Sequence, residues 1–195
     1  MSVEDTSFAR LVSLACHDLR TPLATVHGFA RTLPRMEGVD DSMRRYLEMI
    51  SAASDQLGEL LEDLAHAARI ESGRWQPLLR EVDSFALTLA AAEELGELAS
   101  VTGSGTTVQI DEDTTRRALY LLARCVQRHG ALDHVGIAVA GAEIVVSPVI
   151  PEAVPVVLGE ELKDMGAVIG RRTVEALGGT VRVEGERLSI RLTTP

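Results

Sequence analysis

Aromatic side chains and positive charge are both scarce in this sequence of 195 residues. Phe, Trp and Tyr make up 3% of it, and 19 basic against 29 acidic side chains give a formal net charge of −10. Proteins that bind single-stranded nucleic acid stack bases on aromatic rings, and proteins that bind DNA or anionic lipids present a basic surface. We therefore expect neither nucleic acid nor a membrane among the partners.

Long apolar runs and a secretory leader are also lacking. No uninterrupted apolar stretch approaches the roughly 20 residues that span a bilayer. The first ten residues, MSVEDTSFAR, are acidic and polar, unlike a signal peptide. The only two cysteines, Cys16 and Cys125, have no zinc-type spacing and fall in helix-like segments. Two buried thiols in a reducing compartment are the simplest interpretation, and we expect a cytoplasmic protein.

What the sequence does contain is a regular apolar pattern over residues 5–33. Apolar side chains recur at alternating steps of four and three, which is the 3.5-residue seam of helices packed at shallow angles. The seam positions are Phe8, Val12, Ala15, Leu19, Pro22, Val26, Phe29 and Leu33. We expect one long helix, bent just after Thr21 because Pro22 removes a helical hydrogen bond.

A second helix is predicted to run to about Glu71, with Asp41 or Ser42 as its cap and Ser72 and Gly73 as its stop. Its seam is equally regular: Tyr46, Ile50, Ala53, Leu57, Leu60 and Leu64. Two such helices joined by a short turn form an antiparallel hairpin, whose apolar face needs a partner. Because two hairpins make a four-helix bundle, we expect a homodimer.

Residues 76–195 have a different character and predict a second domain after the hairpin domain of residues 1–75. We expect helices over 81–99, from Asp111 or Asp113 to about 130, and up to 177, with a loop at 103–105, a Pro- and Val-rich connector over 148–158, and strand pairs at 135–147 and 181–192. Helices mixed with mostly antiparallel strands predict an α+β sandwich.

The most specific string is HDLRTPL, from His17 to Leu23, on the first predicted helix. At about 100° per residue, His17 points away from the seam, beside the small residues Ser13, Thr21, Ala24 and Gly28. A neutral imidazole exposed in this way has a ring nitrogen free to act as a nucleophile. Asp18 could hold the other ring nitrogen, Thr21 could position a water, and Arg20 could meet phosphoryl oxygens.

This string resembles the phosphoacceptor box of the dimerisation and histidine-phosphotransfer domain of two-component sensor kinases. The second helix agrees, since Leu60–Leu64 and Arg69–Arg74 resemble the end of the same hairpin. The resemblance implies that His17 is the phosphoacceptor, that Asp18 assists as acid or base, and that Thr21 serves phosphatase action on the regulator.

Kinases of this type carry an ATP-binding domain after the hairpin, and residues 76–195 follow its order of elements. The nucleotide chemistry, however, is missing. The family's magnesium-binding asparagine falls at Cys125, and the chain has no asparagine anywhere. The adenine-binding Asp-x-Gly-x-Gly is replaced by residues 148–151, and the glycine-rich phosphate loop survives only as 164–167. A thiol is a poor ligand for Mg²⁺, and Asp164 would repel phosphate.

These observations lead to the hypothesis of a histidine phosphotransferase on a degenerate kinase scaffold, with no cofactor or metal site of its own. His17 would relay a phosphoryl group between the aspartates of two response-regulator receiver domains, which would supply Mg²⁺. The remaining histidines, His27, His66, His129 and His134, show no metal-ligand spacing. Two alternatives stay open: an active sensor kinase with a divergent pocket, and a dimeric scaffold that binds regulators without transferring phosphate.

Overall fold

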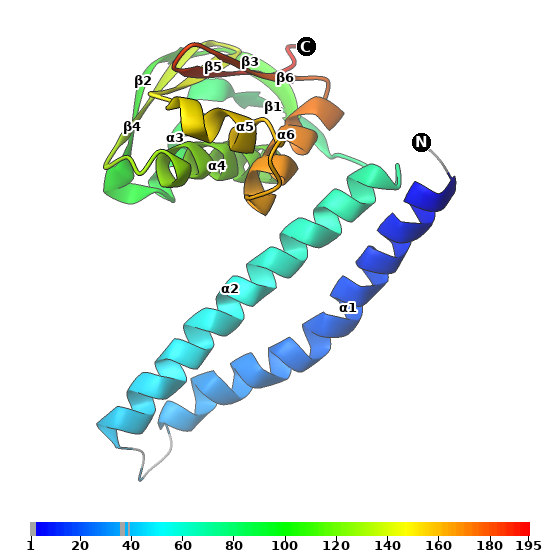
Figure 1. Ribbon diagram of the computed structural model, residues 1–195, viewed down its shortest axis with the longest axis vertical. Coiled ribbons are helices and arrows are strands. Elements are labelled where there is room, and N and C mark those ends of the chain that lie inside the picture. The colour runs from blue at the N-terminus through cyan, green and yellow to red at the C-terminus, as the bar shows by residue number, and fades with distance from the viewer. Residues whose placement is uncertain (1–2, 36–37, 39) are drawn as a thin grey trace. The chain divides into compact units, whose positions relative to one another are not determined.

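The computed structural model of the chain describes the backbone of residues 3–35, 38 and 40–195, and within these ranges the side chains of residue 12 and of residues from 14 onward (Figure 1). The chain divides into two compact units, a helical unit, Met1–Trp75, and an α+β unit, Gln76–Pro195. The helical hairpin and the α+β domain predicted from the sequence are both confirmed.

The helical unit consists of α1 (Val3–Thr32), a short 3-10 turn η1 (Leu33–Arg35) and α2 (Asp41–Glu71). The cap of α2 is Asp40, whose carboxylate accepts the N–H of Met43 at 2.7 Å. The expectation of a cap at Asp41 or Ser42 is therefore wrong by one or two residues. Asp40 supplies the oxygen from an extended backbone, whereas Asp41 is already the first helical residue.

The proline predicted to bend the first helix lies well inside α1. Pro22 lies inside α1 and has no N–H to donate to the carbonyl of Asp18. Figure 1 shows that α1 bows along its length, whereas α2 runs nearly straight. The string from His17 to Leu23 thus contains the turn that lacks this hydrogen bond.

The contact between α1 and α2 does not use the predicted seams. The hydrophobic side chains buried inside the single hairpin lie on a neighbouring stripe: Cys16, Ala30, Leu47, Ala65 and Ala68. Most seam positions stay open to solvent, with Leu19 53%, Phe29 62% and Tyr46 62% exposed. The side chain of Phe8 lies outside the described residues. Each helix therefore carries two apolar stripes, and one hairpin covers only one of them.

The α+β unit is built on a five-stranded sheet with the strand order β2-β4-β5-β7-β6. Only β2 and β4 run parallel, and the other three pairs are antiparallel. The strands are β2 (Ala99–Gly105), β4 (Val135–Gly141), β5 (Glu143–Ser147), β6 (Thr180–Glu184) and β7 (Arg187–Arg191). A separate antiparallel pair joins β1 (Leu79–Asp83) to β3 (Thr107–Asp111).

Helices pack against this sheet to form the second layer of the sandwich (Figure 1). The helices are α3 (Ser84–Glu93), α4 (Glu112–His129), α5 (Val154–Val157) and α6 (Met165–Ala176), with 3-10 turns η2 (Gly96–Leu98) and η3 (Pro151–Ala153). The core between the layers is aliphatic, and Ile110, Leu122, Ile144, Leu188 and Ile190 are fully buried in it. This core is large enough to hold the unit together without disulfides.

Two segments of the α+β unit differ from the sequence prediction. The helix expected over 81–99 is shorter because the carboxylate of Asp83 caps α3 at the Ala86 N–H, and the residues before it pair as β1. The loop expected at 103–105 is the end of strand β2. Gly103 has a φ of +105°, and its missing Cβ lets the carbonyl of Val139 approach closely.

Helices α4 and α6 approach each other through two glycines. A Cβ on Gly170 would lie 2.9 Å from both the carbonyl oxygen of Ala118 and the Cγ of Leu122. One turn earlier, a Cβ on Gly166 would meet the Cδ2 of Leu121 at 2.8 Å and the Oδ1 of Asp164 at 3.1 Å, and both of these atoms are side-chain ends. The backbone obstacle at Gly170 is the stiffer of the two.

We therefore expect Gly170→Ala to lower the free energy of unfolding by about 1–3 kcal/mol, because an extra methyl must push the helices apart. Gly166→Ala is the matched control. Leu121 can rotate away, and the better helix propensity of alanine, up to about 1 kcal/mol, offsets the remaining crowding. Urea unfolding followed by far-UV circular dichroism measures both, and equal losses in the two variants would contradict this account of the α4–α6 contact.

Candidate functional site

The candidate phosphoacceptor lies on the exposed side of α1. His17 and its predicted helpers Asp18, Arg20 and Thr21 are all solvent-exposed, whereas the adjacent Cys16 is 2% exposed. The expected orientation of His17 toward solvent is thus confirmed. An exposed imidazole on a helix is open to in-line approach by another protein, which transfer of a phosphoryl group requires.

The turn of α1 that follows His17 carries a side-chain hydrogen bond to the backbone. The Thr25 hydroxyl donates to the Thr21 carbonyl at 3.2 Å, one turn beyond His17. Among the small residues predicted beside His17, Thr21, Ala24 and Gly28 are exposed, and the side chain of Ser13 lies outside the described residues. The side chains around His17 on this side of α1 are therefore small and leave space for an approaching protein.

A shallow groove of about 420 Å³ runs between α1 and α2, starting one turn after His17. Arg20, Leu23 and His27 line it from α1, and Asp55, Gly58 and Glu62 line it from α2. His27 Nδ1 lies 3.2 Å from Asp55 Oδ1 and ties the two helices together. The groove places one cationic side chain, Arg20, opposite carboxylates of α2.

In the α+β unit, the position to which the resemblance assigns a magnesium-binding asparagine is buried. Cys125 on α4 is 1% exposed. Burial, and then the negative charge of Asp164, raise the pKa of its thiol to about 12. The adjacent residue on the exposed side of α4 is Arg124. A neutral thiol and a guanidinium are both unsuited to Mg²⁺, which prefers oxygen ligands.

Residues 148–151, which the resemblance places where an adenine-binding motif is expected, are held by contacts within the α+β unit. Val149 is buried, and its N–H donates to the carbonyl of Glu186 at 2.8 Å. Pro148 follows a cis peptide bond, and Pro151 begins η3. This segment offers no carboxylate to accept an adenine amine.

At residues 164–167, which resemble a remnant of the phosphate loop, a carboxylate caps the helix N-terminus. Asp164 caps α6, with Oδ1 accepting the Ala167 N–H at 3.1 Å and Oδ2 lying 3.1 Å from His129 Nε2. Backbone N–H groups at a helix N-terminus are the usual donors to phosphate. At this helix an internal anion already occupies that role, so the residues at these three places do not fit a Mg²⁺–nucleotide.

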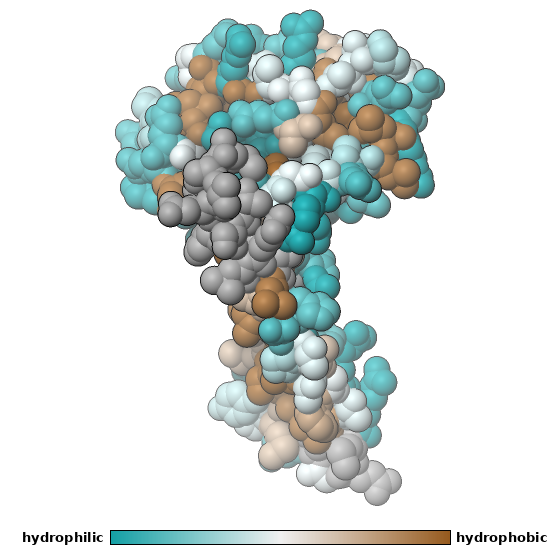
Figure 2. Space-filling model, turned by 90° about the vertical axis from the view of Figure 1, so that its right-hand side faces the viewer, coloured by the Kyte–Doolittle hydropathy of each residue, from teal (hydrophilic) through white to brown (hydrophobic). Residues whose placement is uncertain are grey.

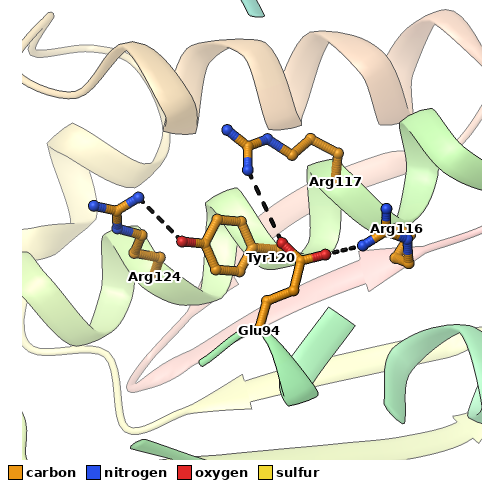
Figure 3. Close-up of polar contacts among 5 residues, drawn as sticks. All are labelled: Glu94, Arg116, Arg117, Tyr120 and Arg124. Carbon is orange, nitrogen blue, oxygen red and sulfur yellow. Dashed lines mark hydrogen bonds and ion pairs between the residues drawn. The ribbon is translucent and has the colours of Figure 1, made fainter. Parts of the chain in front are cut away.

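The exposed side of α4 carries a polar cluster shown in Figure 3. Glu94 forms an ion pair with Arg116 and lies 4.0 Å from Arg117. The Arg124 guanidinium donates to the Tyr120 hydroxyl at 3.1 Å, and both Arg117 and Arg124 lie over the Tyr120 ring, at 5.2 and 5.7 Å from its centroid. These arginines are held by neighbouring side chains of the same unit.

The structure also brings together residues that the sequence analysis did not connect. Cys125 and His129 are one turn apart on α4, and Asp164 joins them from the start of α6. The statement that His129 lacks metal-ligand spacing to a thiol is therefore wrong. The i, i+4 spacing was the available signal, whereas the contribution of Asp164 depends on the packing of α6 against α4.

Comparison with known proteins finds a family model that matches the helical unit. Residues 9–73 match the His Kinase A (phospho-acceptor) domain. The Sensor protein DivL of Caulobacter vibrioides is 29% identical over 97 residues, which cover 50% of this chain and 13% of DivL. The probable sensor histidine kinase TcrY of Mycobacterium tuberculosis is 31% identical over 91 residues, which cover 46% of this chain and 19% of TcrY.

Solved structures show that the fold of the whole chain is shared. Full-length ShkA, crystallised with AMPPNP, superposes with a TM-score of 0.69 at 20% identity, covering 95% of this chain and 47% of ShkA. The histidine kinase AdeS of Acinetobacter baumannii superposes with a TM-score of 0.57 at 16% identity, covering 91% of this chain and 98% of AdeS. At these identities the likeness shows the fold alone.

The helical unit thus matches the His Kinase A (phospho-acceptor) domain, and the α+β unit shares its fold with the corresponding part of solved structures such as the histidine kinase AdeS. The chain spans less than a fifth of the length of either curated relative. Among the described helices, none is long and apolar enough to cross a bilayer.

The raised pKa of Cys125 makes a prediction about its reactivity. In a metal-free Cys16→Ser variant, the remaining thiol is expected to react with Ellman's reagent at pH 8 at least ~100-fold more slowly in the native than in the urea-unfolded chain, because the thiolate is the reactive form. Between pH 7 and 9 the native rate should rise about tenfold per unit without a plateau, since both values lie well below the pKa of about 12. Similar rates in native and unfolded chains would contradict this environment.

Proposed function

We propose that this chain is a histidine phosphotransferase that relays a phosphoryl group between receiver-domain aspartates without using ATP. The observation that carries the proposal is the contrast between the two units. His17 is exposed on α1, whereas Asp164 occupies the start of α6 and Cys125 is buried as a neutral thiol. The phosphoacceptor is accessible, and the nucleotide positions are filled by the protein's own groups.

The proposed transfer needs few groups from this chain. A ring nitrogen of His17 attacks the phosphorus of an aspartyl phosphate, the N–P bond forms, and the P–O bond to the aspartate breaks so that its carboxylate leaves. The proton on the other ring nitrogen is held or accepted by Asp18, and Arg20 offers positive charge to the phosphoryl oxygens. The receiver supplies its own Mg²⁺, and reversal of the same step passes the phosphoryl group to a second receiver. Thr21, one turn from His17, would position water for phosphatase action on the regulator.

We further propose that the helical unit functions as a homodimer. The uncovered stripe includes Leu19 and Phe29 of α1 and Tyr46, Ile50 and Leu57 of α2, all more than 40% exposed. Figure 2 shows apolar side chains running along the hairpin. A continuous apolar stripe of this length on a lone hairpin is unfavourable in water and marks a surface for association. A second copy offers the same 3.5-residue spacing, which completes a four-helix bundle.

An active sensor kinase is the second candidate, favoured by the names of DivL and TcrY and by the AMPPNP complex of ShkA. It requires binding of a Mg²⁺–nucleotide in the α+β unit. A scaffold that binds regulators without accepting phosphate is the third. The source of phosphate on His17 separates the three.

The purified chain is therefore incubated with radiolabelled Mg²⁺–ATP alone and, in parallel, with phosphorylated receiver domains from its own genome. We expect acid-labile label from receivers and none from ATP. His17→Gln should abolish the label, and His134→Gln, an exposed histidine of the α+β unit, should retain it. Label from ATP alone would establish a kinase, and no label in either arm would favour the scaffold.

The dimer is tested by placing a charge on the open stripe. Ile50→Glu is expected to raise the dissociation constant of the dimer at least tenfold, corresponding to about 1.4 kcal/mol, because a carboxylate would be buried among apolar side chains. Glu48→Lys, an exposed position on the opposite side of α2, is the control and should leave association unchanged. Sedimentation velocity over a range of concentrations measures both, and a monomeric parent chain would refute the dimer.

A further inference from the structure

We propose that Cys125, His129 and Asp164 form a binding site for a borderline-soft divalent cation, with Zn²⁺ as the preferred ion. Cys125 Sγ and one ligand atom each from His129 and Asp164 all lie within 4.8 Å of one another. The site goes beyond the proposed relay, does not depend on it, and differs from a Mg²⁺–nucleotide site in its ligands.

The donor set determines which metal fits. One thiolate, one imidazole and one carboxylate are ligands that Zn²⁺ accepts in a tetrahedral arrangement, at about 2.3 Å for sulfur and about 2.0–2.2 Å for nitrogen and oxygen. Such a tetrahedron has edges of about 3.3–3.8 Å. The three ligand atoms lie within 4.8 Å of one another, so the longest distance between two of them needs to shorten by only about 1 Å. Mg²⁺ requires six oxygen-type ligands, of which this site has one protein carboxylate.

The geometry of the two helices preorganises the ligands. Cys125 and His129 project from the same side of α4 because residues four apart lie one turn above each other, the spacing that zinc-binding helices also use. Asp164 is oriented by its bond from the Ala167 N–H to Oδ1, which leaves Oδ2 toward His129 Nε2 at 3.1 Å. A hydrogen-bonded partner that orients a ligand in this way is typical of metal sites.

Burial and charge also fit a cation. Cys125 is buried, whereas the side chains of His129 and Asp164 are 22% and 14% exposed, so a small ion can enter from their side. The same negative charge of Asp164 that opposes a thiolate attracts a metal ion, and the metal stabilises both anions. On binding, Zn²⁺ takes the place of the thiol proton, which is released, and any proton on His129 Nε2 moves to Nδ1 or to solvent.

A bound ion would join the last turn of α4, at His129, to the N-cap of α6, Asp164, which lies 35 residues further along the chain. This contact adds to the packing of the two helices at Gly166 and Gly170. The expected consequence is a stabilisation of the α+β unit that increases with metal concentration.

The test uses the full chain, freed of any affinity tag, and Co²⁺ as the spectroscopic probe. We expect one equivalent of Co²⁺ to produce the intense visible bands of a tetrahedral ion and a thiolate-to-metal charge-transfer band, both displaced by Zn²⁺ and unaffected by excess Mg²⁺. Cys125→Ser should abolish the charge-transfer band, and the matched control Cys16→Ser, which removes the other buried thiol, should retain it.

Two further variants keep the proposal falsifiable should Cys125→Ser disturb the core. Asp164→Asn retains a cap for α6, and His129→Gln changes a partly exposed residue, and each is expected to weaken Zn²⁺ binding at least tenfold with an unchanged circular dichroism spectrum. Absence of saturable binding, a band that survives Cys125→Ser, or affinities unchanged in both other variants would each overturn the site.

Discussion

The structure of the helical unit depends on a geometric constraint: each helix carries two apolar stripes, and one hairpin can bury only one of them. Cys16 faces the partner helix and is buried, while Leu19, on one side of it, lies in the open stripe. His17 is about 100° from Cys16 on the other side, so neither contact covers it. The two stripes thus fix the direction of the exposed histidine. A second copy that covers the open stripe would leave His17 free.

In the α+β unit the corresponding constraint is that buried polar groups must be paired. Asp164 pairs with the Ala167 N–H and with His129, and the Val149 N–H pairs with the Glu186 carbonyl. A nucleotide entering at these places would have to displace those internal partners, and each displaced group would lose a hydrogen bond in a partly buried setting. The polar groups at these places are used to stabilise the fold of the domain. Their pairing therefore supports a relay in which the phosphate comes from another protein and not from a bound nucleotide.

The hairpin could be predicted closely because its information is local. Apolar spacing, Pro22 and the Ser72–Gly73 stop all act within a few residues. The error at β2 has a different cause: the segment around Gly103 has a turn-like composition, and it becomes a strand only because Val139 of β4 lies against it. Similarly, β1 is a strand through its pairing with β3, about 28 residues away in register. Non-local pairing of this kind leaves little trace in a single sequence.

The same distinction explains what could be said of the candidate sites. His17 was identifiable because its neighbours on one helix carry the pattern. The Cys125–His129–Asp164 cluster needs two helices in contact, so only half of it, the i, i+4 pair, is visible in the sequence. A thiol at Cys125 is a soft donor and not a hard one. The proposed absence of a Mg²⁺–nucleotide and the proposed Zn²⁺ site therefore share this side chain, while His129 and Asp164 supply the other ligands of the proposed site where α4 meets α6.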